Sequence, residues 1–283
     1  MTQYCYLNGH FLATDRAHIS VQDRGFRFGD GVFETIAVYS GMPYQWELHM
    51  ERLKAGLSAL TIPADTDQLR QPALQLISKN GLSDATLRIA ISRGVGSIGY
   101  LPVGCACSTV VIEAFERLLP PPDPASLWLS SYEKPSPKAL PVQFKLSQGL
   151  NSTLVRMEGA SHGCQDGLLL NAARHICETS SANIFWLKGE TLYTPSLSCG
   201  VLNGTTRSAI LRVSPYRVKE GAFSLDELQV ADAIVMTNTA WQVMPVGSLK
   251  PTGWEWPGST ALAVQLRHAL HQDVSAYVAA HHA

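Results

Sequence analysis

A proline-rich segment, LLPPPDPAS at residues 118–126, divides the chain of 283 residues. Four of its nine residues are proline, which removes backbone hydrogen-bond donors and stiffens the chain. A chain of this length exceeds the usual size of a single hydrophobic core. We therefore expect a small N-terminal domain over residues 1–117, a linker over 118–126 and a larger C-terminal domain over 127–283.

Strand-like and helix-like spacings of apolar residues occur on both sides of this segment. YCYLNGHFL predicts a hairpin around Asn8 and Gly9, and ATLRIAIS and STVVIEAF predict two paired strands around a glycine-rich loop. ICETSSANIFWLKGETLYTP predicts a strand meander with a turn at Lys188 and Gly189. Amphipathic helices are expected from near Glu47 and in the C-terminal tail. Strands in meanders with segregated helices indicate two α+β domains.

The composition argues against several classes of function. Hydrophobic residues make up 46% of the chain, charged residues 16%, and the net charge is -1. This balance gives no electrostatic reason to bind nucleic acid or an anionic membrane. Apolar runs such as ADAIVM are too short to span a bilayer, and the N-terminus lacks the pattern of an export signal. We therefore expect a cytoplasmic protein.

The cysteines indicate free thiols. None of them forms a CxxC pair, and a zinc site would need closer clustering with histidine, so we expect no metal site. The CAC at residues 105–107 predicts a strand that places both sulfur atoms on one face. Reduced, mostly buried thiols fit the cytoplasm. The six cysteines stand at positions 5, 105, 107, 164, 177 and 199.

Lys145 occupies an unusual place in the segment PVQFKLSQGLNSTLVRMEGA, residues 141–160. It follows an apolar turn and precedes a predicted helix, on which Leu150, Leu154 and Met157 fall on one face. A lysine here is either a solvated surface charge or an amine held in a pocket for chemistry.

Three other features are each ambiguous alone. GVLNGTTR predicts a glycine turn into a helix N-terminus, which suits a phosphate group or is simply a threonine cap at Thr205 or Thr206. Glu178 is either a partly buried acid or a solvated strand end. Arg52 is either a phosphate ligand or an exposed helical arginine. With Lys145, these features supply what pyridoxal phosphate requires: an amine, an acid for the ring nitrogen and a phosphate site.

The chain resembles the fold-type IV pyridoxal-phosphate enzymes, the class IV aminotransferase family. The resemblance covers six blocks in the family's order: FGDGVFETIAVYSG with HMERL, ISRG…GY, the lysine segment, ETSSANIFW, GVLNGTTR and TNTAWQVMPVG. It implies the two-domain α+β fold of D-amino acid aminotransferase. It also implies a homodimer, and pyridoxal 5'-phosphate as the cofactor.

The resemblance also implies roles for individual residues. Lys145 corresponds to the Schiff-base lysine, Glu178 to the acid at the pyridine nitrogen, and Arg52 to the phosphate-binding arginine. Thr205 and Thr206 match the turn whose backbone N–H groups hold the phosphate. Thr239, in TNTAW, matches a further phosphate or substrate contact.

Within the family the chain is most similar to 4-amino-4-deoxychorismate lyases, which release pyruvate and leave 4-aminobenzoate for folate synthesis. Thr35 falls where those lyases carry a threonine linked to proton delivery, and otherwise reads as a strand residue. Arg93 and Arg24 are candidates for binding substrate carboxylates, with surface salt bridges as the alternative.

Two departures weaken the lyase assignment. Ile98 stands where many lyases have an arginine, and KLSQGLN departs from their usual lysine segment. An amino-acid aminotransferase of the D-amino acid or branched-chain type is the alternative, although the tyrosine that branched-chain enzymes carry near Leu150 is missing. A non-catalytic pyridoxal-phosphate-binding homologue is the third possibility.

Overall fold

The structure is a computed structural model that describes residues 3–117 and 124–281. The chain forms two compact units of mixed helix and strand, which confirms the predicted α+β fold in two parts. Unit 1 consists of residues 1–118, 144–149 and 276–283, and unit 2 of residues 119–143 and 150–275.

The described strands of unit 1 form a six-stranded sheet in the order β2-β1-β6-β5-β3-β4. The predicted hairpin is confirmed: Asn8 and Gly9 have φ of 46° and 95°, the left-handed pair that a two-residue hairpin loop needs. The strands are β1 (Tyr4–Leu7), β2 (His10–Ala13), β3 (Gly31–Tyr39), β4 (Met42–Pro43), β5 (Ala85–Ser92) and β6 (Thr109–Glu116).

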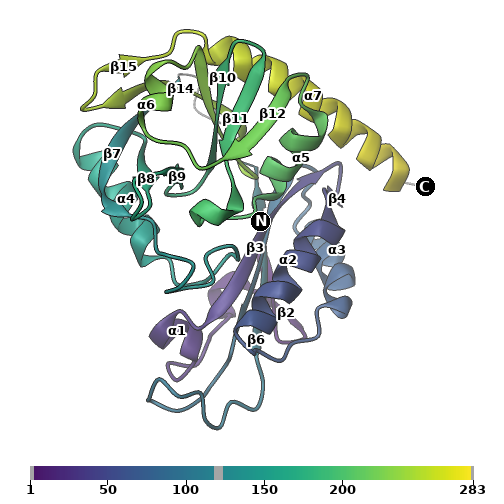
Figure 1. Cartoon of the computed structure of the whole chain (residues 1–283). Coiled ribbons are helices and arrows are strands. Elements are labelled where there is room, and N and C mark those ends of the chain that lie inside the picture. Colours follow the sequence, from purple (N-terminus) through teal and green to yellow (C-terminus); the bar gives the residue numbers. More distant parts are fainter. Residues whose placement is uncertain (1–2, 118–123, 282–283) are drawn as a thin grey trace. The chain divides into compact units, whose positions relative to one another are not determined.

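Two helices cover one face of this sheet, α2 (Trp46–Ala59) and α3 (Arg70–Lys79) (Figure 1). Alternate residues of β5, among them Leu87, Ile89 and Ile91, point into the core beneath these helices and are fully buried. The residues between them, such as Arg88, therefore lie on the opposite face. A short helix, α1 (Arg24–Phe28), precedes β3.

The loop between β5 and β6 differs from the prediction. Residues 105–107 form no strand; Cys105 is half-buried and Cys107 is exposed. Gly94 has φ of +81°, and a Cβ there would meet the carbonyl oxygen of Cys107 at 1.9 Å. The backbones of Gly94 and Cys107 therefore approach too closely for a side chain at position 94.

The described strands of unit 2 form a nine-stranded sheet with the path β12-β11-β10-β13-β14-β7-β8-β9, and β15 pairs with β14. β9 also pairs with β10, through Glu178 and Asn183, so the path turns back on itself at these two residues. The strands are β7 (Ala125–Glu133), β8 (Asp166–Leu170), β9 (Ile176–Thr179), β10 (Asn183–Lys188), β11 (Thr191–Pro195), β12 (Arg217–Gly221), β13 (Ala233–Asn238), β14 (Gln242–Lys250) and β15 (Trp254–Glu255).

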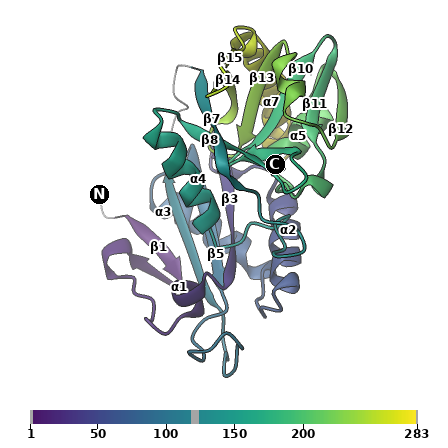
Figure 2. The same cartoon turned by 60° about the vertical axis from the view of Figure 1, so that its left-hand side comes forward.

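Helix α4 (Leu150–Ser161) lies beside β7 and β8 (Figure 2). The helix was predicted, but its buried face was not: Leu150 and Met157 are 62% and 63% exposed, whereas Val155 and Gly159 are buried. A Cβ at Gly159 would meet the backbone of Asp166 at 2.8 Å, so the helix packs through its smallest residue. The other helices are α5 (Thr205–Val213), α6 (Asp226–Gln229) and α7 (Ser259–His281).

The predicted domain boundaries differ from the two units in one important place. Lys145 was expected in the C-terminal domain, but residues 144–149 group with unit 1 because their backbone bonds β3. Phe33 N donates to Lys145 O at 2.9 Å, and Ser147 N donates to Gly31 O at 2.9 Å. Positions 118–123 of the predicted linker lie outside the described residues, and residues 125 and 126 belong to β7. Among the described residues, no helix has the length and apolar character needed to cross a membrane.

Candidate active site

Lys145 lies against an aromatic ring of unit 1. Its side chain is half-buried, and its Nζ is 4.5 Å from the centroid of the Phe33 ring. The two backbone bonds to β3 fix the segment, so the amine is held over one place on the sheet. Of the two readings of Lys145, a freely solvated charge or an amine held by its surroundings, this geometry favours the second.

Phe33 brings a second cation to the same place. The guanidinium carbon of Arg88 lies 4.1 Å from the Phe33 ring centroid. Thr35 follows Phe33 on the same face of β3 and stands directly opposite Arg88 in the register of β3 and β5. Lys145, Phe33, Thr35 and Arg88 thus gather on one face of the sheet of unit 1.

A buried carboxylate, Glu34, lies on the other face of β3. It is 1% exposed and accepts hydrogen bonds from Arg52 Nε at 2.7 Å and Arg52 Nη2 at 2.6 Å. The Nδ1 atom of His49 lies 2.6 Å from Glu34 Oε2. Arg52 and His49 are three residues apart on α2, which brings both side chains to the same acid.

The charge states in this cluster follow from burial and pairing. Burial by itself raises the pKa of Glu34, but hydrogen bonds and charges from His49 and Arg52 outweigh it and lower the pKa to about 2. Burial also lowers the pKa of His49, with Arg52 and Lys145 adding to the effect against the opposing influence of Glu34. A neutral His49 therefore donates its Nδ1–H to an ionised Glu34.

Glu178 is the corresponding buried acid of unit 2. Its carboxylate accepts from Lys134 Nζ at 2.5 Å on Oε1, and from Asn183 Nδ2 and Leu202 N at 3.0 Å each on Oε2. The residue is 5% exposed. Of the two readings of Glu178, a buried acid with a cationic partner or a solvated strand end, the structure places it in the first situation.

The turn into α5 is tied to the same acid. Asn183 Nδ2 also donates to Leu202 O at 3.0 Å, and a Cβ on Gly204 would meet Asn183 Oδ1 at 2.1 Å. Gly204 is the N-cap residue of α5, and no side chain caps the helix. Thr205 and Thr206 are buried in its first turn, where backbone N–H groups have no partner within the helix. The structure thus brings a helix N-terminus, the kind of element that suits an anion, close to Glu178.

Thr239 lies in the turn between β13 and β14, and this turn contacts the β9–β10 connection that follows Glu178. Asn238 Nδ2 donates to Ser181 O at 3.4 Å, which ties that turn to the β9–β10 connection. Thr237 pairs with Asn183 across β13 and β10, and its Oγ1 is buried without a hydrogen-bond partner among the described residues. Unit 2 therefore gathers the acid, the helix N-terminus and the Thr239 turn.

Arg24, a predicted substrate-binding residue, has internal partners. It is 3% exposed, and its guanidinium donates to Asp30 Oδ2 at 2.8 Å. It also donates to the carbonyl oxygens of Ser97, Gly99 and Tyr100 at 3.1, 2.7 and 2.8 Å. Arg24 thereby organises the loop after β5, and a substrate carboxylate would have to displace these partners.

Arg93 is held in the same way. It donates to both carboxylate oxygens of Asp30, at 2.8 and 3.1 Å, and to the carbonyl oxygens of Leu60 and Thr61 at 2.6 and 3.0 Å. Burial raises the pKa of Asp30, but Arg93 and then Arg24 outweigh it, so the net shift is downward. The roles of Arg93 and Arg24 in substrate binding remain predictions.

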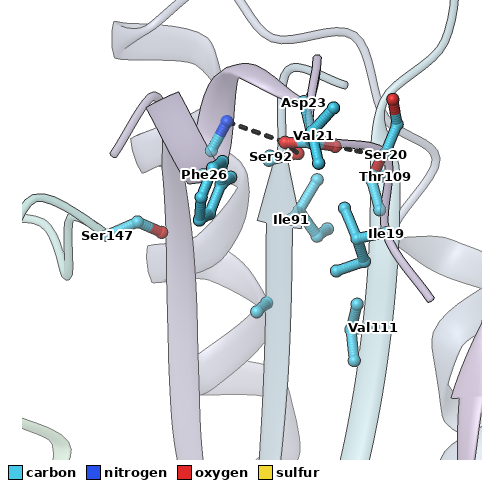
Figure 3. A pocket seen from close by; sticks show the side chains of 12 residues that line it. Ile19, Ser20, Val21, Asp23, Phe26, Ile91, Ser92, Thr109, Val111 and Ser147 are labelled. Atoms are coloured by element: carbon cyan, nitrogen blue, oxygen red, sulfur yellow. Dashed lines mark hydrogen bonds between the residues drawn. The ribbon is translucent and has the colours of Figure 1, made fainter. Parts of the chain in front are cut away.

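An apolar pocket of about 370 Å³ opens on the same face of the unit 1 sheet as Arg88. Ala90 and Ser92 contribute to it and share the face of β5 that carries Arg88. Figure 3 shows Asp23 at its edge, where the carboxylate accepts from Ser92 Oγ at 2.7 Å and Thr109 Oγ1 at 2.6 Å. The side chains of Asp23, Ser92 and Thr109 are thus paired with one another, and the remaining lining is mainly apolar.

Several residues of these two clusters were not predicted from the sequence. They are Glu34, His49, Arg88, Lys134 and Asn183. The strand alternation of ATLRIAIS contained a signal for Arg88, because a charged residue between Leu87 and Ile89 must point away from the core. Lys134 carried no such signal, because its contact with Glu178 joins residues 44 positions apart.

Comparison with known proteins finds a family model, described as Amino-transferase class IV, that matches residues 31–249. The chain is 29% identical over 275 residues to the aminodeoxychorismate lyase of Bacillus subtilis, covering 92% of each chain. It is 29% identical over 264 residues to the branched-chain-amino-acid aminotransferase of Escherichia coli, covering 87% of this chain and 84% of the relative. A crystal structure of the branched-chain aminotransferase from E. coli has a TM-score of 0.90 at 27% identity, covering 96% of this chain and 94% of the other.

Proposed function

The chain belongs to the class IV aminotransferase family of pyridoxal-phosphate-dependent enzymes, and we propose that it is a 4-amino-4-deoxychorismate lyase. Such a lyase releases pyruvate from its substrate and leaves 4-aminobenzoate, a precursor in folate synthesis. The placement of Thr35 carries the proposal, because its side chain lies on the face of β3 on which Phe33 holds the Lys145 amine. A hydroxyl on this face is in the right place to deliver a proton to the departing three-carbon fragment.

The residues present fit the cofactor. In unit 2 an uncapped helix N-terminus with buried Thr205 and Thr206 suits a phosphate group, and Glu178 suits a protonated ring nitrogen. In unit 1 Lys145 supplies an amine, and Arg52 a guanidinium whose orientation Glu34 fixes. We propose that these residues hold the cofactor, with Thr239 as a further contact. When bound, pyridoxal phosphate supplies an electron sink for the bond that breaks at the substrate amine carbon.

The chain's own residues then divide the remaining work. Lys145 removes the proton from the carbon that bears the substrate amino group, acting as a general base beside the Phe33 ring. The carbon–oxygen bond to the three-carbon fragment breaks with its electron pair leaving on the oxygen, and the Thr35 hydroxyl relays the proton taken up by Lys145 to the carbon that becomes the methyl group of pyruvate. Arg88, opposite Thr35, offers a guanidinium to one of the two substrate carboxylates.

An amino-acid aminotransferase is the second candidate, and the match to the E. coli branched-chain enzyme favours it. Such an enzyme passes the amino group to a 2-oxo acid. The arrangement of Lys145 and Arg88 serves this reaction equally well, because both substrates are amines with a carboxylate. Thr35 has no required role in transamination, so the two reactions differ in their need for its hydroxyl.

One assay separates the two functions. Purified protein loaded with cofactor is mixed with 4-amino-4-deoxychorismate and no 2-oxo acid, and pyruvate and 4-aminobenzoate are measured. Release of both products is the expected result; no release removes the lyase. In a parallel sample with an amino donor alone, conversion of the cofactor into its amine form reveals the aminotransferase. A protein that binds cofactor and does neither is a non-catalytic homologue.

We propose that two copies pair through the face of unit 1 on which the pocket of Figure 3 opens. Ile19, Val21 and Phe26, which line the pocket of Figure 3, are 50%, 73% and 77% exposed, and a group of exposed apolar side chains around one pocket is typical of an interaction site. Light scattering should give the mass of a dimer for the wild type, and Phe26→Glu should lower it. A monomeric wild type would contradict the proposal.

The buried free thiols Cys5, Cys164, Cys177 and Cys199 fit a cytoplasmic location, which we also keep as a proposal.

A further inference from the structure

Lys134 forms an ion pair with Glu178, the acid that faces the cofactor ring in the proposed function. It follows the last residue of β7, and its backbone N donates to Leu170 O at 2.9 Å, which anchors it to β8. Its Nζ donates to Glu178 Oε1 at 2.5 Å. The side chains of Lys134 and Glu178 are 13% and 7% exposed, so solvent screens this pair far less than a surface salt bridge.

The remaining donors to Glu178 show which oxygen is still available. Within the described part of the chain, Oε2 accepts two hydrogen bonds, from Asn183 Nδ2 and Leu202 N. Oε1 accepts one, from Lys134. An ionised carboxylate oxygen has two lone-pair positions, so the unused acceptor position lies on Oε1. A further N–H donor that reaches Glu178 must therefore share Oε1 with Lys134.

We propose that Lys134 is a positioning residue that holds the Glu178 carboxylate in place and shares Oε1 with the cofactor's ring nitrogen. The inference rests on the proposed function, because it requires the ring of pyridoxal phosphate at Glu178. Before the cofactor binds, Lys134 is the charge that compensates a buried carboxylate. With the cofactor bound, the second acceptor position on Oε1 would be the one open to the ring N–H, and Lys134 would keep the carboxylate from turning away.

This arrangement explains why a lysine suits the position. Removing one partner of a buried ion pair leaves an uncompensated charge, which is far costlier than losing an exposed pair. The flexible lysine stem also lets the ammonium move aside without breaking its contact when the ring arrives. Asn183 cannot replace it, because the Asn183 amide is already bonded to Oε2 and to Leu202 O.

The first test is a double-mutant cycle on the cofactor-free protein, with melting temperature as the readout. Lys134→Met should lower the melting temperature by on the order of 10 °C, because it leaves Glu178 without its cation. In a Glu178→Gln background the same substitution should cost much less, because the charge is gone. Lys138→Met, four residues along and exposed, is the matched control and should change little.

The second test adds pyridoxal phosphate at saturation. The rise in melting temperature on binding should be larger in Lys134→Met than in the wild type, because the ring nitrogen then supplies the missing cation. Lys134→Arg keeps a cation and should restore the wild-type values. In turnover, Lys134→Met should lower kcat and leave KM within about twofold, because Lys134 acts through Glu178 and not on the substrate.

Three results would overturn the inference. Equal melting temperatures for Lys134→Met and Lys138→Met would show that the pair does not compensate Glu178. If Lys134 and Glu178 are coupled in the cofactor-free protein but the cofactor raises the melting temperature equally in Lys134→Met and wild type, Lys134 forms only a structural ion pair. No cofactor-induced rise in any protein, wild type included, would show instead that the proposed function has failed and the inference with it.

Discussion

Arg52 donates two parallel hydrogen bonds to Glu34, from Nε to Oε1 at 2.7 Å and from Nη2 to Oε2 at 2.6 Å. Both side chains are nearly excluded from solvent, at 9% and 1% exposure. The planar guanidinium therefore has one orientation relative to β3, which a single-point contact would not impose. We expect this pair to fix the direction in which Arg52 presents its positive charge.

Replacing Glu34 should destabilise unit 1. Glu34→Gln leaves the Arg52 guanidinium buried without its counter-charge, and we expect a loss of about 3–5 kcal/mol in the free energy of unfolding. Urea denaturation measures the change. Glu51→Gln, exposed on the same helix, should stay within about 0.5 kcal/mol of the wild type. Equal midpoints for the two variants would contradict the assigned importance of the pair.

Lys145 should be the residue that carries the cofactor. Borohydride treatment of the loaded wild type should fix the phosphopyridoxyl mass on a peptide containing Lys145. Lys145→Arg keeps a cation beside Phe33 but cannot form the covalent bond, so the label and turnover should both disappear. Lys54→Arg, with a side chain 51% exposed, serves as the control. Labelling of Lys145→Arg to the wild-type extent would refute the assignment.

The Thr35 hydroxyl should matter for pyruvate release alone. Thr35→Val keeps the shape and strand preference but removes the proton donor, and we expect kcat for the lyase reaction to fall about 10²- to 10⁴-fold. Thr35→Ser should retain most of the activity. Conversion of the cofactor by an amino donor should be nearly unchanged in Thr35→Val. If pyruvate release survives in Thr35→Val, the hydroxyl is not the proton relay.

Arg88 should bind a substrate carboxylate through its forked guanidinium. Arg88→Lys keeps the charge but loses the second hydrogen bond, so KM should rise roughly tenfold or more while kcat changes less. Steady-state kinetics with a carboxylate substrate and with its amide would check this, because the amide should be insensitive to the change. Arg70→Lys, with a side chain 36% exposed, is the control. An unchanged KM would exclude Arg88 from the substrate site.

Stability should fall in acid because of His49 and Glu34. The pKa of His49 lies below its usual 6.5 in the folded protein, so unfolding takes up a proton and stability is lost as pH falls below 6.5. Glu34, with a folded pKa of about 2 against a usual 4.5, contributes stability above 4.5 that is lost as pH falls from 4.5 toward 2.

His49→Gln tests the first of these effects. The drop in melting temperature between pH 7.5 and pH 5 should be smaller in His49→Gln than in the wild type, whatever the variant's absolute stability. His18→Gln, an exposed histidine, should show the wild-type drop. The same drop in all three proteins would rule out His49 as the source.

The sequence allowed most of the elements to be predicted because their signals are local. The Asn8–Gly9 hairpin needs only left-handed residues between two alternating strands, and the alternation of β5 is uninterrupted. The buried face of α4 could not be obtained this way. Leu154 and Met157 suggested it, but packing is decided at Gly159, where the backbone of Asp166 leaves no room for a side chain.

The site residues divide along the same line. Lys145 and Glu178 were predicted because they belong to sequence blocks that resemble a family, and the structure adds what surrounds each of them. Arg24 was predicted to be a substrate ligand, which remains a prediction, and the structure adds internal partners for it: the Asp30 carboxylate and the backbone carbonyls of Ser97, Gly99 and Tyr100. Contacts of this kind depend on how a loop closes, which no spacing within the sequence encodes.

The side-chain amide of Asn183 connects the Glu178 carboxylate to the turn that precedes α5. Asn183 Nδ2 donates one hydrogen bond to Glu178 Oε2 and one to the carbonyl oxygen of Leu202, which lies two residues before the N-cap residue Gly204. If the proposed function holds, a shift of the carboxylate on binding of the cofactor ring should therefore reach the loop that precedes α5, where we propose that the phosphate binds. Binding of the ring at Glu178 and binding of the phosphate at the turn before α5 should therefore strengthen or weaken together.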